Sequence, residues 1–195
     1  MFLTFLNPVT ARTANQHQAA LIAKPSPLQN HGDYSEAKKC PNGFRNILNK
    51  CVKVVTERQT GNKAFETCKQ LGANLAILNS KTYFDKLTKY LMDNFRESCT
   101  STRSSGSFWT AGHRLHDTNV FVWKPSKLSK HMTGHCRNAI ITKNWAKNQP
   151  DNTYNNEDCV EMFIDGNEMK FNDLPCAKGP NYIYKNCAVC QTNKK

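Results

Sequence analysis

The spacing of hydrophobic residues predicts one strand and two helices in the first half of the chain. Residues 51–55 alternate in the way that is typical of a strand. Residues 58–71 place apolar side chains on one side of a helix, and Gly72 follows where helices commonly end. After a short apolar run at 75–78, Ser80 can cap a second helix. The predicted core-facing stripe of that helix is Phe84, Leu87, Leu91 and Phe95.

The second half of the chain predicts short strands that are separated by polar loops. The predicted strands are residues 107–112, 120–123, 159–164, 169–173 and 182–184. A long basic connection without periodicity covers residues 124–143. Residues 148–152 cannot form a helix interior, because Pro150 lacks the N–H that a helix needs. Two helices followed by an antiparallel, loop-rich sheet indicate an α+β fold.

Residues 1–39 differ from the rest of the chain and predict a disordered N-terminal arm. They contain no cysteine and a polar, proline-containing mixture. Their apolar start breaks at Asn7-Pro8 and lacks a positive charge, so we interpret it as a weak or truncated signal peptide. We place the folded domain at residues 40–190 and a short tail at residues 191–195.

The cysteine content indicates an oxidising compartment and therefore a secreted, extracellular protein. The chain has 195 residues, of which 9 are cysteines. Only Cys187 and Cys190 form a Cys-x-x-Cys pair, and no second such pair completes a zinc site. An odd number leaves one cysteine without a partner in the chain, which makes a disulfide-linked dimer a candidate assembly.

The charge is strongly positive but carries little information about a partner. Lys and Arg number 27 against 15 Asp and Glu, which gives +12. Such a charge suits an anionic partner, but the lysines are spread along the whole chain. We therefore read them as a solvated surface and predict no nucleic-acid partner. No apolar stretch is long enough for a transmembrane helix.

Several short motifs follow one another in the order typical of one family. They are Cys40-Pro41-x-Gly43-Phe44 with Cys51, Cys68, Phe108-Trp109-x-Ala111-Gly112, Trp123, Trp145, Gln149-Pro150-Asp151, Glu157-Asp158-Cys159, and Phe171-Asn172-Asp173 with Cys176. Together they resemble the long form of the C-type lectin domain over residues 40–190. The resemblance implies the C-type lectin fold, with two helices, antiparallel sheets, a long loop region and stabilising disulfides.

The same resemblance implies a calcium site that also binds sugar. Calcium takes oxygen ligands from carboxylates and carbonyls, and the implied ligands are Gln149, Asp151, Glu157, Asn172 and Asp173. The predicted sugar-binding residues are these five and Tyr154, whose ring can stack on a sugar face. In the family, a cis bond before Pro150 would turn both neighbouring side chains toward one ion. A Gln-Pro-Asp motif goes with galactose-type sugars in this family, and Glu-Pro-Asn goes with mannose-type sugars. Asp117 and Asp158 are weaker candidates for an accessory calcium site.

The disulfide pairing is also implied by the resemblance, with one choice left open. A turn signal at residues 40–44 ahead of the strand at 51–55 fits a hairpin closed by Cys40 and Cys51. The family pairs Cys159 with Cys176, and Cys68 with a C-terminal cysteine, here Cys187 or Cys190. Cys99 and Cys136 have no role in the family, so we expect them to pair with each other and to pin the long connection. One of Cys187 and Cys190 would then be spare for an intermolecular bridge.

These observations predict a secreted, calcium-dependent lectin for glycans with terminal galactose-type sugars. The resemblance to the family also implies a role in microbial recognition or agglutination. No nucleophile–base pair can be placed in one site, so no enzyme is predicted. His131 and His135 have metal-ligand spacing, but their neighbours form no helical stripe, and we read them, with His113 and His116, as surface residues. The alternative is a calcium-independent module that binds a protein or an anionic surface through basic loops.

Overall fold

A computed structural model of the chain describes residues 39–101, 104–116, 118–124, 141–177 and 183–193. The chain divides into two compact units, Met1–Glu36 and Ala37–Lys195, and all described residues belong to the second. The predicted N-terminal arm, apart from Lys39, lies outside the described residues, as do Asp117 and the segment that holds His131, His135 and Cys136. Among the described helices, none combines the length and the apolar character that a membrane span requires.

The described strands form one mixed sheet. Its main path is β1 (Arg45–Ile47), β2 (Lys50–Gln59), β8 (Asn186–Asn193), β4 (Ser107–Arg114), β6 (Cys159–Asp165) and β7 (Glu168–Leu174), in that spatial order. The short strands β3 (Asn74–Leu75) and β5 (Phe121–Trp123) pair with β8 and β4. All of these pairs are antiparallel except β4 with β8, which is parallel.

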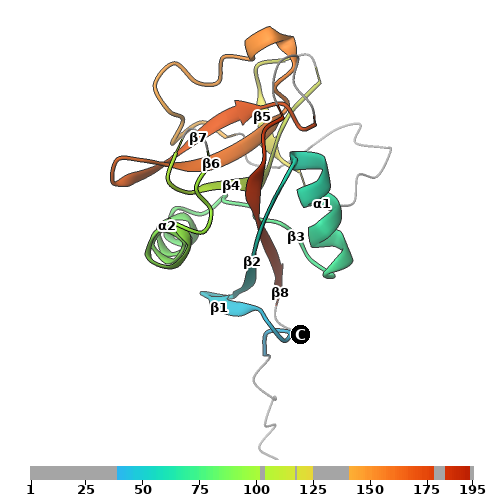
Figure 1. The fold of residues 1–195 in the computed structure, drawn as a ribbon, viewed down its shortest axis with the longest axis vertical. Coiled ribbons are helices and arrows are strands. Elements are labelled where there is room, and N and C mark those ends of the chain that lie inside the picture. The colour runs from blue at the N-terminus through green and yellow to red at the C-terminus, as the bar shows by residue number, and fades with distance from the viewer. Residues whose placement is uncertain (1–38, 102–103, 117, 125–140, 178–182, 194–195) are drawn as a thin grey trace, which may run out of the picture. The chain divides into compact units, whose positions relative to one another are not determined.

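The two predicted helices are present, with one shifted boundary. Helix α1 spans Gly61–Gln70 and α2 spans Lys81–Phe95, and they lie on either side of the β2–β8 pair (Figure 1). Ser80 is the N-cap of α2, as predicted, and its hydroxyl accepts from the Tyr83 N–H. The first helix begins three residues later than predicted, because Arg58 and Gln59 still belong to β2. Thr60 caps α1 instead.

An aromatic cluster fixes the strand that carries part of the site. Phe171 in β7 is 2% exposed, and its ring packs edge-on against Phe84, Trp123 and Trp145 with centroids 5.7 to 6.1 Å apart. Offset and edge-on ring pairs are the favoured aromatic geometries. Phe171 therefore anchors β7 immediately before Asn172 and Asp173.

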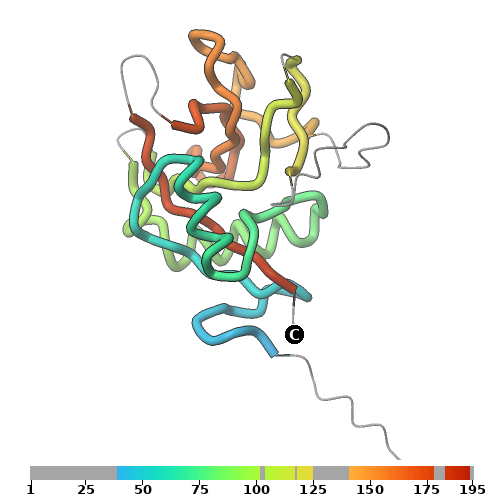
Figure 2. Tube along the Cα trace, turned by 90° about the vertical axis from the view of Figure 1, so that its right-hand side faces the viewer, coloured from blue at the N-terminus to red at the C-terminus, as the bar shows by residue number. Residues whose placement is uncertain are grey.

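The last strand differs from the prediction. Tyr184 lies outside any strand, Tyr182 is not described, and the real strand is β8, which continues three residues past Cys190. Figure 2 shows β8 in red, running through the domain alongside β2. Residues 186–191 are all buried, so β8 lacks the alternation that reveals a strand with one wet face. Gln191, which we expected in a tail, accepts hydrogen bonds from the Tyr83 hydroxyl (3.0 Å) and the Ile77 N–H (3.1 Å).

Four disulfides pair eight of the nine cysteines. Cys40–Cys51 and Cys159–Cys176 are confirmed, Cys68 pairs with Cys190, and Cys99 pairs with Cys187. The expected Cys99–Cys136 pair is therefore wrong, and neither Cys187 nor Cys190 is spare. Two residues three apart on a strand face opposite sides, so Cys190 meets α1 while Cys187 meets the chain just after α2. Cys136 is the cysteine left over, and it lies outside the described residues.

Candidate calcium and sugar site

Three of the predicted calcium ligands converge at one end of the sheet. Asp151 and Glu157 come from the loop before β6, coloured orange near the top of Figure 1, and Asp173 comes from β7. Carboxylate oxygens of these residues lie within 4.8 Å of one another. Asp151 is exposed, whereas Glu157 and Asp173 are 5% and 0% exposed. The arrangement therefore offers one accessible carboxylate in front of two buried ones.

Gln149 lies beside Asp151. The Gln149–Pro150 peptide bond is cis. The Gln149 side-chain amide donates to Oδ2 of Asp151 at 3.2 Å, and the Asp151 N–H donates to Oε1 of Gln149 at 3.1 Å. The two side chains on either side of the proline thus contact each other next to the carboxylate cluster.

Asn172 and Tyr154 differ sharply in exposure. Asn172 is buried, and its Nδ2 donates to Oε1 of Glu161 at 3.1 Å. Asn172, Glu161 and Gln149 line one hollow of about 210 Å³. Tyr154 is 69% exposed and has a φ of 57°, which is rare for a bulky side chain. Its ring is therefore presented to solvent.

Backbone amides of the loop already contact the carboxylates. Asp173 accepts from the N–H groups of Asp151 (3.1 Å) and Asn152 (2.9 Å), and Glu157 accepts from the Thr153 N–H (3.0 Å). In return, the side chain of Asn152 accepts from the Glu157 N–H. The backbone of the loop is therefore hydrogen-bonded to its own Glu157 and to Asp173 of β7. Each carboxylate keeps further acceptor capacity because its two oxygens offer about four lone-pair positions.

Burial and like charge shape the acidity of the cluster. Burial, reinforced by the charge of Asp173, raises the pKa of Glu157 from 4.5 to about 8. Burial also raises the pKa of Asp173, against the opposing effect of its amide donors and Arg114. Burial would raise the pKa of Asp151, but hydrogen bonds from Thr153, Glu157 and Gln149 outweigh it and lower that pKa. Three repelling carboxyl groups with oxygen donors around them fit a hard divalent cation.

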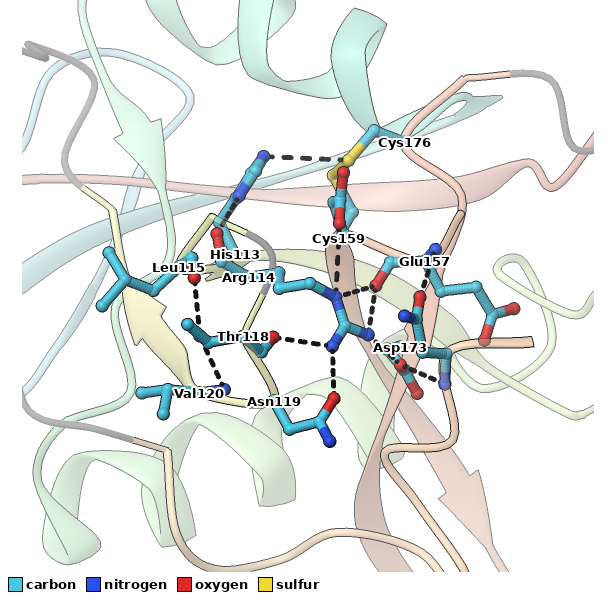
Figure 3. Close-up of polar contacts among 12 residues, drawn as sticks. His113, Arg114, Leu115, Thr118, Asn119, Val120, Glu157, Cys159, Asp173 and Cys176 are labelled. Carbon is cyan, nitrogen blue, oxygen red and sulfur yellow. Dashed lines mark hydrogen bonds and ion pairs between the residues drawn. A yellow bond between two sulfur atoms is a disulfide. The ribbon is translucent and has the colours of Figure 1, made fainter. Parts of the chain in front are cut away.

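Arg114, at the end of β4, is a residue of this site that the sequence analysis missed. Its side chain is 4% exposed, and Nη2 donates to Oδ2 of Asp173 at 2.8 Å. Figure 3 shows the guanidinium between Asp173, the carbonyl of Glu157, Thr118 and Asn119. The only signal in the sequence is a charged residue that closely follows the strand predicted at residues 107–112.

The accessory calcium site is not assembled by the described residues. Asp158 pairs with Arg114, with Oδ1 3.3 Å from Nε, and Asp117 is not described. His113 lies near Cys159 and Cys176, but both sulfurs are in a disulfide and cannot serve as thiolate ligands. His113 is also partly buried rather than a surface residue, and its Nδ1 lies 2.9 Å from the Arg114 carbonyl oxygen.

Comparisons with known proteins place the chain in a family. The family model described as C-type lectin domain-containing protein 141/158 matches residues 40–191. A C-type lectin of Cerberus rynchops is 27% identical over 146 residues, which cover 73% of this chain and 80% of that protein. Among solved structures, the carbohydrate-recognition domain of cow CD23, determined with a GlcNAc2Man3 oligosaccharide, shares the fold with a TM-score of 0.57 at 21% identity, covering 82% of this chain and 99% of that one. A calcium-independent type II antifreeze protein shares it with a TM-score of 0.57 at 17% identity, covering 83% and 100%. This chain belongs to the C-type lectin domain family.

Proposed function

We propose that this domain is a secreted, calcium-dependent lectin for glycans with terminal galactose-type sugars, and that it has no catalytic role. The observation that carries the proposal is the convergence of Asp151, Glu157 and Asp173 within 4.8 Å, beside Gln149. The four disulfides support secretion, because such bonds persist in oxidising compartments.

The residues of the site have different proposed roles in binding calcium and sugar. Asp151, Glu157 and Asp173 would hold calcium with their carboxylates, and Gln149 and Asn172 would add amide oxygens. When bound, calcium supplies a Lewis-acid contact for two neighbouring sugar hydroxyls. The same side chains orient the sugar by hydrogen bonds, and the exposed ring of Tyr154 offers a stacking surface for its apolar face.

Calorimetry tests the proposal in two steps. Calcium is titrated into chelator-treated protein, and methyl galactoside and methyl mannoside are then titrated into the calcium-loaded protein. We expect calcium binding, followed by a preference for galactoside. Absence of calcium binding would overturn the metal site, whereas a preference for mannoside would overturn the sugar class alone.

The order of amide and acid around Pro150 is expected to set the sugar class. Exchanging them, with Gln149→Glu and Asp151→Asn together, keeps the charge and the number of oxygen donors. Because each misplaced hydrogen bond costs about 1–3 kcal/mol, the ratio of galactoside to mannoside affinity should fall by about 10- to 100-fold. Calcium affinity should stay close to that of the wild type, which serves as the internal control. An unchanged sugar ratio would show that other residues choose the sugar.

Calcium affinity is expected to rise with pH up to the pKa of Glu157. Calcium binds the carboxylate, but the raised pKa of about 8 keeps Glu157 protonated at neutral pH in the metal-free protein. Affinity should therefore increase about tenfold per pH unit between about pH 6 and 8 and level off above. Calorimetry at about pH 7 in two buffers of different ionisation enthalpy should show close to one proton released per ion. A calcium affinity that stays constant across this pH window would contradict the proposed competition between calcium and the proton on Glu157.

The stability of the metal-free protein is expected to depend on pH for the same reason, the raised pKa of Glu157. The raised pKa means that the folded metal-free protein binds more protons than the unfolded chain between about pH 4.5 and 8, so its stability falls as pH rises through that window. Calcium binds the carboxylate form of Glu157 and therefore offsets this fall in stability. The gain in melting temperature on adding calcium should therefore be larger at the upper end of the window, about pH 8, than at about pH 6.

Useful glycan binding would require more than one site. An exposed single-sugar site with millimolar affinity contributes about −4 kcal/mol, and linking two such sites raises the overall affinity. Cys136, the cysteine left over by the four disulfides, is our candidate for linking two chains. Microbial recognition or agglutination would follow from such multivalent binding.

A calcium-independent binding module is the second candidate. The net charge of +12 favours it, as does the likeness in fold to an antifreeze protein described as calcium-independent. Such a module would bind a protein or an anionic surface through its basic loops. Its binding would survive chelator and weaken as added salt screens the charges.

A further inference from the structure

We propose that the Arg114 guanidinium is a built-in cation that holds the calcium-binding loop in place without a metal ion. The proposal rests on the proposed function only for the identity of the metal. It predicts an ordered loop in the metal-free protein and a single calcium ion per chain.

Arg114 joins the strand β4 to β7 and to the loop that carries Glu157. Nη2 donates to Oδ2 of Asp173 at 2.8 Å and to the carbonyl oxygen of Glu157 at 2.9 Å, and Nε donates to the same carbonyl at 3.1 Å. Asp173 in turn receives the N–H groups of Asp151 and Asn152. One side chain therefore connects β4, β7 and the loop into a continuous set of hydrogen bonds.

The rest of the guanidinium faces more oxygens. Nη1 donates to the carbonyl oxygen of Thr118 at 3.0 Å and to Oδ1 of Asn119 at 3.2 Å (Figure 3). Nε lies 3.3 Å from Oδ1 of Asp158. With Glu157 and Asp173, two carboxylates, two backbone carbonyls and one amide oxygen surround the group. Carboxylates and carbonyls are also the ligands of calcium, so the guanidinium stands where a second hard cation would otherwise be attracted.

The surroundings of Arg114 hold its guanidinium in one position. Its side chain is 4% exposed, and the guanidinium carbon lies 4.5 Å from the centroid of the Phe121 ring. Arginine keeps its charge throughout the physiological pH range and presents planar, directional donors. Unlike a bound ion, it cannot be removed by a chelator. The loop should therefore keep its hydrogen bonds to Asp173 when calcium is absent.

Amide exchange in the presence of chelator tests the proposal without any sugar. The amides of Asp151, Asn152 and Thr153 report on the loop. The amides of the buried Ala73 and Ala76, which donate to the carbonyl oxygens of Cys68 and Val189, report on the fold. In the wild type we expect protected loop amides with and without calcium. In Arg114→Gln, protection of the loop amides should fall at least tenfold in chelator and recover at saturating calcium, while the amides of Ala73 and Ala76 stay protected. Arg114→Lys, which keeps the charge with fewer donors, should recover part of the loss.

A milder variant keeps the test decisive if Arg114→Gln does not fold. Asp158→Asn removes one exposed carboxylate partner of Arg114 and should reduce protection of the loop amides in chelator by a few fold. Asp165→Asn, which changes an exposed acid away from the site, is the matched control.

The number of bound ions is a separate measurement. Native mass spectrometry should count one calcium ion per chain.

Three results would overturn the proposal: wild-type loop amides that exchange freely in chelator, Arg114→Gln amides as protected as the wild type, or two ions per chain. Failure of galactose binding would leave all three measurements interpretable, so the two proposals can fail separately.

Discussion

Replacing Asp151 with Ala is expected to abolish calcium-dependent binding of galactose-type glycans while leaving the fold intact. Asp151 is exposed, and its carboxylate accepts hydrogen bonds from its loop neighbours Gln149 and Thr153, so its truncation removes no core packing. The change removes one of three converging carboxylates. Because loss of even an indirect partner of a metal commonly costs 10- to 100-fold in metal affinity, loss of a direct ligand should cost about 100-fold or more.

The matched control for this variant is Asp165→Ala. Asp165 is also an exposed acid, but it lies at the turn between β6 and β7, so the variant changes the net charge equally without touching the site. Calorimetry should show calcium binding lost in Asp151→Ala and kept in Asp165→Ala, with similar melting temperatures in chelator. Equal calcium affinity in the two variants would contradict a metal site at Asp151.

Removing the Cys68–Cys190 disulfide is expected to cause a much larger loss of stability than removing the Cys40–Cys51 disulfide. The bond joins α1 to β8 across 122 residues, and both cysteines are fully buried. In the chain-entropy account, the loss is about 5 kcal/mol for this separation, against about 3 kcal/mol for a closed loop of 11 residues. The double variant Cys68→Ala/Cys190→Ala should therefore unfold at much lower urea than the wild type.

Cys40→Ala/Cys51→Ala is the comparison, since that bond closes only the N-terminal hairpin with a separation of 11. Urea unfolding, analysed by linear extrapolation, gives both free energies of unfolding. The long-range variant should lose more by about 2 kcal/mol. A loss no larger than that of the hairpin variant would show that β8 is held mainly by its strand pairing.

The parts of the fold that the sequence predicted well are those with local signals. The cap at Ser80 and the stripe ending at Phe95 located α2, because capping and helical spacing act within a few residues. The strand β8 was missed because it is buried on both faces between β2 and β4, so its side chains do not alternate. The error over Cys187 had the same origin, since only its position on β8 shows that it faces the end of α2.

The candidate site was also predicted only in part. The sequence motifs predicted Asp151, Glu157 and Asp173, and these carboxylates do converge. Arg114 could not be found, because its contacts with Asp173 and Glu157 join residues 59 and 43 positions apart. A lone arginine at the end of a strand carries no local sign that it will be buried among acidic groups.

Retention on immobilised galactose separates a calcium-dependent lectin from a basic binding module in one experiment. The refolded, disulfide-bonded chain is applied with calcium, and separate columns are washed with chelator at low salt and with high salt in calcium. We predict retention in calcium, full elution by chelator and little elution by salt. Retention that persists in chelator but disappears in salt would contradict a calcium-dependent lectin and favour the basic binding module.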